Sequence, residues 1–145
     1  MNTKKTTGKK GEKVFTAEER AAIQQRAKEV KAGEEDGERV VLEKIGQMEP
    51  SDRAVAKRVH EVVMKSVPTL TPRLWYGMPA YSNKDGKTVC FFQDARKFKT
   101  RYSTFGFNDS AKLDDGEMWP VAFALTKLTP AAESRIAALV KKAVG

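Results

Sequence analysis

Side chains that commonly carry out enzyme chemistry are sparse in this sequence. It contains one histidine, His60, and one cysteine, Cys90, and neither has a partner at a spacing typical of a catalytic pair. His60 follows Val59 in a helical pattern, and we expect it at the surface or edge of that helix. No base or cation beside Cys90 would lower its thiol pKa, so we expect a buried structural thiol. We therefore predict no catalytic residues and no enzymatic activity.

An acidic group lies near the aromatic residues in the second half of the chain. Carboxylates in a loop can bind a hard cation, although the spacing here does not match the twelve-residue calcium loop. A simpler interpretation is a turn at 114–116, in which aspartate side chains bond to the backbone. The candidate metal ligands are Asp109, Asp114, Asp115 and Glu117.

Basic residues form two groups. The first 13 residues contain five lysines and one glutamate, so they supply half of the net charge of +8. We expect residues 1–15 to be a disordered basic tail with weak, salt-dependent affinity for phosphate. Between 97 and 104, basic residues alternate with Phe98, Thr100, Tyr102 and Thr104, which predicts a strand with one solvated face. The candidate nucleic-acid contacts are Lys97, Lys99 and Arg101.

Eleven of the twelve aromatic residues lie between Trp75 and Phe123. We expect 75–81 to form one strand, with Trp75 and Tyr81 on one face and Tyr76 on the other. Helices would cover one face of the sheet, and the second face would need the first helix, a partner chain or a ligand. This predicts an aromatic-lined groove for an unknown small molecule or protein partner. The candidate ligand-binding residues are Trp75, Tyr76, Met78, Tyr81, Phe105 and Trp119.

The elements that must position these residues begin with helices. Thr16 and Glu19 fit a capping box, which predicts an accessory helix over 16–32 that ends at Gly33. Apolar residues at helical spacing predict a second helix over 41–48, broken at Pro50, and a third up to 67, capped by Ser51 or Asp52.

Strand patterns follow the helices. Residues 88–93 and 121–125 read as strands, and 83–86 reads as a hairpin turn. Thr129 and Pro130 start a terminal helix. The predicted fold class is α+β: an antiparallel β-meander of about four to five strands, packed by N-terminal helices and a C-terminal helix.

Composition bounds the class of protein. A chain of 145 residues with 40% hydrophobic and 32% charged residues fits one ordinary domain, which we assign to 33–145. No run approaches the roughly 18 apolar residues of a membrane span. The N-terminal lysines precede no apolar stretch, unlike a secretory signal. The lack of a signal-like pattern and the single cysteine together favour a cytoplasmic location. The sequence makes no prediction of the oligomeric state.

Three segments resemble a known family in order and spacing: 75–81 (WYGMPAY), 104–107 (TFGF) and 121–125 (VAFAL). They look like the YdhG-like family of small bacterial proteins of unknown function, over approximately Gly33 to Gly145. The resemblance implies an antiparallel sheet packed by helices, similar to the frataxin-like arrangement. Some relatives are described as intracellular iron chaperones, so the resemblance also implies iron as an alternative ligand. No other cofactor is expected.

Overall fold

The computed structural model describes residues 16–145, apart from the side chains of 23 and 25–36. The predicted tail, 1–15, lies outside the described residues. The chain divides into two units between Gly33 and Glu34, and each is described by itself.

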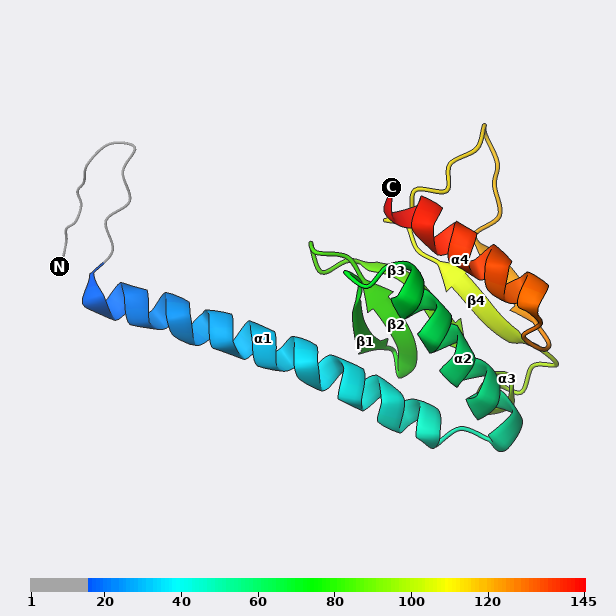
Figure 1. Ribbon diagram of the computed structural model, residues 1–145, viewed down its shortest axis with the longest axis horizontal. Helices are drawn as coiled ribbons and strands as arrows, with labels where there is room; N and C mark the ends of the chain where they lie inside the picture. Colours follow the sequence, from blue (N-terminus) through cyan, green and yellow to red (C-terminus); the bar gives the residue numbers. More distant parts are fainter. Residues whose placement is uncertain (1–15) are drawn as a thin grey trace. The chain divides into compact units, whose positions relative to one another are not determined.

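Five antiparallel strands form one sheet in the order β1-β2-β3-β4-β5 (Figure 1). Each strand therefore pairs with the next one along the chain, and the predicted α+β meander is confirmed. The strands are β1 (Thr71–Trp75), β2 (Met78–Ser82), β3 (Thr88–Gln93), β4 (Ser103–Phe107) and β5 (Ala122–Leu125). The helices are α1 (Ala17–Gly46), α2 (Pro50–Ser66), α3 (Ala95–Phe98) and α4 (Pro130–Val144).

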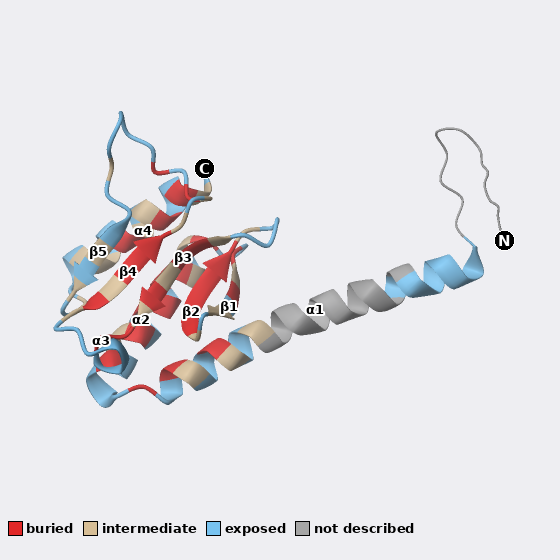
Figure 2. Cartoon of the chain, turned by 180° about the vertical axis from the view of Figure 1, so that it is seen from behind, coloured by how far each residue is buried: buried red, intermediate tan, exposed pale blue. Residues whose placement is uncertain are grey.

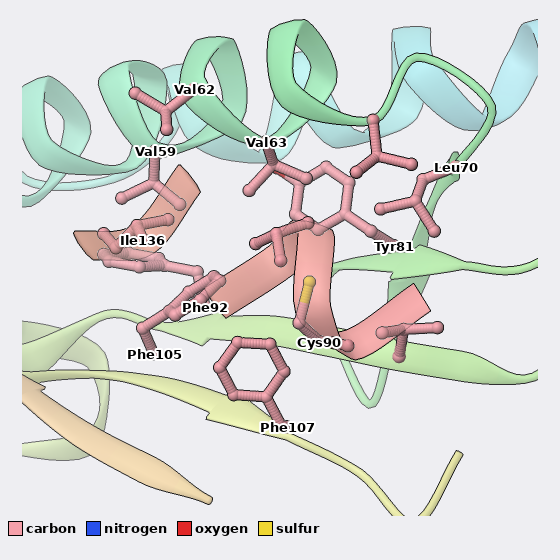
Figure 3. Close-up of a cluster of buried hydrophobic side chains, with 14 of the residues drawn as sticks. Val59, Val62, Val63, Leu70, Tyr81, Cys90, Phe92, Phe105, Phe107 and Ile136 are labelled. Atoms are coloured by element: carbon pink, nitrogen blue, oxygen red, sulfur yellow. The ribbon is translucent and has the colours of Figure 1, made fainter. Parts of the chain in front are cut away.

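The hydrophobic core lies between α2, α4 and one face of the sheet. Register places Tyr81 opposite Cys90, Cys90 opposite Phe107, and Phe92 opposite Phe105, so these side chains share a face. Figure 3 shows them pointing toward valines of α2 and Ile136 of α4. The predicted burial of Cys90 is confirmed, since its side chain is fully buried.

The opposite face of the sheet is closed partly by its own residues. Phe91 pairs with Gly106 across β3 and β4, and its ring lies where a side chain at 106 would stand. Trp75 packs on Phe91 with ring centroids 5.2 Å apart. An aromatic ring covering a strand glycine restores the side-chain packing that glycine lacks.

Helix α1 corrects the prediction of a break at Gly33. Its start agrees with the sequence, because the Thr16 hydroxyl accepts from the Glu19 amide (3.1 Å) and the Glu19 carboxylate accepts from the Thr16 amide (2.8 Å). The helix then continues through Gly33 to Gly46 and absorbs the second predicted helix. A glycine inside a helix costs only about 1 kcal/mol, which good helix formers around it offset.

Pro50 begins α2, as the break there predicted, but the cap is Glu49, which makes no side-chain capping bond. Neither Ser51 nor Asp52 caps the helix. Asp52 is instead buried, and its carboxylate accepts from the backbone amide of Arg96 at 2.8 Å. A tertiary hydrogen bond has therefore replaced the predicted local one.

The segment 75–81 is a hairpin and not the single strand that we expected. Trp75 pairs with Met78, so Tyr76 and Gly77 form a two-residue turn with φ of 51° and 78°. Trp75 and Met78 therefore share a face, whereas Tyr81 lies on the core face. The strand prediction failed because Gly77 supplies the positive φ that lets the chain reverse.

The predicted strand over 97–104 is also wrong. Residues 95–98 form the short helix α3, and Lys99 ends it in the left-handed conformation (φ 56°). Strand β4 begins only at Ser103. The alternation of basic residues in 97–101 arose in an exposed helix and turn, where no sheet face selects side chains.

His60 is buried, contrary to the surface position that we expected. Only 6% of it is exposed. Its Nδ1 lies 2.9 Å from the Tyr81 hydroxyl, and its Nε2 lies 3.1 Å from Oε2 of Glu38. The imidazole links α1, α2 and β2 because both ring nitrogens have partners.

Among the described residues, the helices are all too short or too polar to cross a membrane.

Candidate functional site

Strand β5 forms one edge of the sheet, because it pairs only with β4. Its pattern alternates between exposed alanines, Ala122 and Ala124, and half-buried Phe123 and Leu125. Figure 2 shows the contrast between this exposed strand and the buried strands β2, β3 and β4. An edge strand of apolar residues without a charge is unusual, since natural edges commonly carry one.

Helix α4 lies beside β5 and begins in the way that the sequence predicted. Thr129 caps it, with its hydroxyl accepting from the Ala132 amide at 3.2 Å, and Pro130 occupies the first turn. Ile136 and Val140 face the core. The cap sets where the helix starts, and therefore which residues of α4 face β5.

A groove of about 490 Å³ runs between β5 and α4. That volume lies within the range of ligand pockets. All four residues of β5 line one wall, and residues of α4 at intervals of four line the other. The full lining is Phe105, Ala122, Phe123, Ala124, Leu125, Ala131, Ala132, Arg135, Ile136 and Leu139.

Arg135 is the one charged residue in this lining. Its guanidinium lies over the Phe123 ring, 5.2 Å from the ring centroid, as expected for a cation–π contact. Among the side chains that the structure describes, Arg135 forms no ion pair with a carboxylate. The groove thus joins apolar walls to a cation whose hydrogen-bond donors are available.

A neighbouring ion pair shows what a paired guanidinium looks like in this fold. Arg58 of α2 donates to both carboxylate oxygens of Glu133 at 2.8 Å. This contact raises the pKa of Arg58 and lowers the pKa of Glu133, chiefly through the hydrogen bonds between them. Glu133 is therefore engaged with α2 and does not neutralise Arg135.

The structure does not bring the predicted aromatic set into one groove. Tyr81 and Phe105 are 0% and 1% exposed and belong to the core, although Phe105 also lines the β5–α4 groove. Met78 is buried, and Trp119 packs against the core from outside. Trp75 and Tyr76 contact each other at the β1–β2 turn, where Tyr76 is 82% exposed.

The predicted metal ligands lie in the loop between β4 and β5, and all four are exposed. Gly116 in this loop has positive φ (70°), as the predicted turn requires. Across the described residues, no three His, Cys, Asp or Glu side chains come together in a way that would hold a metal ion. Asp109, Asp114, Asp115 and Glu117 therefore do not form such a group.

The predicted nucleic-acid contacts lie on and after α3, and all are exposed. Lys97 approaches Gly77 of the β1–β2 turn, while Arg101 lies over the Tyr102 ring at 5.3 Å. Lys97 also lies over the Phe98 ring at 5.5 Å. The structure thus places two of these cations over neighbouring rings, whereas a strand would have put the charges and the rings on opposite faces.

Sequence reasoning missed most of the groove. It predicted the strand over 121–125 and the terminal helix that starts at Thr129 and Pro130, but it gave Arg135, Ala131, Ala122 and Ala124 no role. One signal was present: α4 carries apolar residues over a wider arc than one contact surface needs. The outward alanines of β5 also leave room beside the strand.

No protein-family model matches this chain, and searches of curated proteins and of solved structures find no significant match either. The resemblance to the YdhG-like family stays a prediction, and so does the iron-binding role that it implies.

Proposed function

We propose that this protein is a non-enzymatic binding domain whose β5–α4 groove takes a small organic acid with an apolar body. The observation that carries the proposal is Arg135, whose guanidinium has no carboxylate partner among the described side chains and lies beside the apolar groove of about 490 Å³. Medium-chain carboxylic acids have this chemistry.

Each part of the ligand meets a matching surface. Ala124, Leu125 and Leu139 offer apolar contact to a hydrocarbon chain, and its burial supplies most of the binding free energy. The carboxylate accepts hydrogen bonds from Arg135, which are stronger than neutral ones because both groups are charged. The shape of the groove selects the hydrocarbon chain of the ligand, and the charge of Arg135 selects its carboxylate.

The cytoplasm is the compartment that we propose for this role. The lone thiol of Cys90 is buried, and the domain needs no disulfide to hold its core together.

The test uses decanoate and its uncharged analogue, 1-decanol, as competitors of the fluorescent probe anilinonaphthalene sulfonate. Wild type is expected to bind the probe saturably and to prefer decanoate to decanol. Arg135→Gln should lower the affinity for decanoate about tenfold and abolish the preference, because one charged hydrogen-bonded contact contributes about 1.5–3 kcal/mol. Arg101→Gln removes another arginine that lies over a ring and should change nothing.

A second pair of variants tests the position of the site. Ala131→Glu places a carboxylate on the groove wall in the first turn of α4, where the helix dipole favours it, and should repel decanoate. Ser134→Glu adds the same charge to the same helix outside the lining and should bind normally. If decanoate binds all four variants as it binds wild type, the proposal is wrong.

A further inference from the structure

The β1–β2 turn combines an unusual backbone with an unusual exposed ring. Tyr76 and Gly77 both have positive φ, as in the two-residue hairpin turns that favour Asn-Gly. Tyrosine in this conformation is strained, and 82% of Tyr76 is exposed, so core packing does not explain its presence. Residues held in such conformations often lie at functional sites.

Two lysines from different elements meet beside this turn. Nζ of Lys97, on α3, lies 3.2 Å from the position that a Cβ at Gly77 would take. Contact with the Lys97 amine and the charge of that amine lower the pKa of Lys44, on α1, so the two side chains are neighbours. Asp94 acts in the opposite direction but does not cancel the effect. The two amines therefore repel each other in the free protein.

The surroundings add to the positive potential. Arg96, Lys99 and Arg101 follow Asp94 along the chain and are exposed, whereas Asp94 is buried. Asp52, whose carboxylate accepts from the Arg96 amide, is the second buried acid here. The five cations outnumber these two acids, and such an excess of positive charge attracts anions. An oxyanion between Lys44 and Lys97 would convert their repulsion into two attractive contacts.

We propose that Lys44, Lys97 and the Tyr76–Gly77 turn bind a nucleotide unit, with its phosphate on the two amines and its base on the Tyr76 ring. Trp75 supports the ring edge-on, with centroids 4.8 Å apart. Bases of every type stack on an exposed aromatic ring, so the site selects a phosphate beside a planar base without selecting its sequence. This site lies at the β1 side of the sheet and does not depend on the β5–α4 groove.

The test is a titration of the ¹⁵N-labelled protein with AMP, and with adenosine as the analogue that lacks phosphate. AMP is expected to shift the amides of Gly77 and Lys97 saturably, with adenosine at least about tenfold weaker. Lys97→Met and Lys44→Met should each weaken AMP binding by about tenfold or more. Both variants remove a repulsion, so they should fold at least as well as wild type.

Matched variants separate the base from the phosphate. Tyr76→Asn keeps a residue that tolerates positive φ and restores the preferred Asn-Gly turn, so the variant should fold normally. Wild type should bind AMP more tightly than inorganic phosphate, and this variant should bind the two with equal affinity. Lys84→Met changes an exposed lysine of the β2–β3 hairpin and should bind AMP as wild type does.

The nucleotide unit could belong to a free nucleotide or to a nucleic-acid strand, and a titration with single-stranded hexadeoxyadenylate distinguishes the two. Tighter binding than AMP, with a steep salt dependence, identifies a nucleic-acid strand as the ligand; equal or weaker binding identifies a free nucleotide. The proposal fails if AMP causes no saturable shift at millimolar concentration, or if Lys44→Met and Lys97→Met both bind AMP normally.

Discussion

At the scale of single residues, His60 shows how the fold can constrain a side chain that the sequence pattern placed at the surface. Its ring bridges Tyr81 in the core and Glu38 at the surface. Sequence periodicity placed His60 beside the core stripe of α2 but gave no information about polar partners on other elements. Those partners come from residues 22 positions before and 21 after it, and only the fold brings them together.

Tyr81→Phe is expected to lower the free energy of unfolding by about 1–3 kcal/mol, because Nδ1 of His60 would lose its partner inside the core. Urea denaturation followed by circular dichroism measures the change. Tyr76→Phe, which removes the hydroxyl of an exposed tyrosine, should stay within about 0.5 kcal/mol of wild type. Equal values for the two variants would show that the His60–Tyr81 hydrogen bond contributes nothing.

Cys90 is expected to resist alkylation in the native protein. Burial raises the pKa of its thiol well above the ordinary value, so both access and thiolate formation are suppressed. Iodoacetamide at mildly alkaline pH should label the protein in urea but not in buffer, as measured by intact mass. Rapid labelling of the folded protein would mean that β3 opens easily.

At the scale of elements, the errors of the sequence prediction share one physical cause. Periodicity identified α2, β3, β5 and α4 because each presents one face to a core. It failed at 75–81 and 97–101, where a turn and an exposed short helix have no such face. The sequence did not predict the β5–α4 groove, because the groove depends on the distance between β5 and α4. No local sequence pattern contains information about that distance.

Two glycines of α1 should respond oppositely to the same substitution. A Cβ on Gly37 would collide with the carbonyl of Pro72 in β1, whereas a Cβ on Gly46 would meet nothing within 4 Å. We expect Gly37→Ala to destabilise the protein by about 1–3 kcal/mol through this overlap. Gly46→Ala should be neutral or stabilise it by up to about 1 kcal/mol, because alanine is the better helix former.

Thermal and urea unfolding of the two alanine variants measure these effects. A destabilised Gly46→Ala together with a neutral Gly37→Ala would contradict the close approach of α1 to β1.

At the scale of the whole molecule, the Arg58–Glu133 pair joins α2 to α4 across 75 residues of chain. Because the pKa of Glu133 is lower in the folded state than its ordinary value, its contribution to stability is present above that ordinary value. The contribution is lost as the pH falls through the lower, folded pKa. Glu133→Gln should therefore be less stable than wild type at neutral pH, and the difference should vanish in acid.

Urea unfolding at a series of pH values tests this prediction. Glu43→Gln, which breaks an exposed pair with Arg39 inside one helix, should have a small effect, because such pairs contribute little. A stability difference for Glu133→Gln that stays constant from neutral to acid pH would assign its effect to packing and not to charge.

The order of the sheet has a consequence for how the chain is made. Because each strand pairs with the one before it, every strand that leaves the ribosome finds its neighbour already synthesised, and the entropy lost in closing each loop stays small. The core face is covered later, since Ile136 and Val140 belong to α4, which is translated after all five strands. A nascent chain that stalls before Thr129 would carry all five strands without α4. The part of the core face that α4 covers would then be an exposed apolar surface of the kind that chaperones bind.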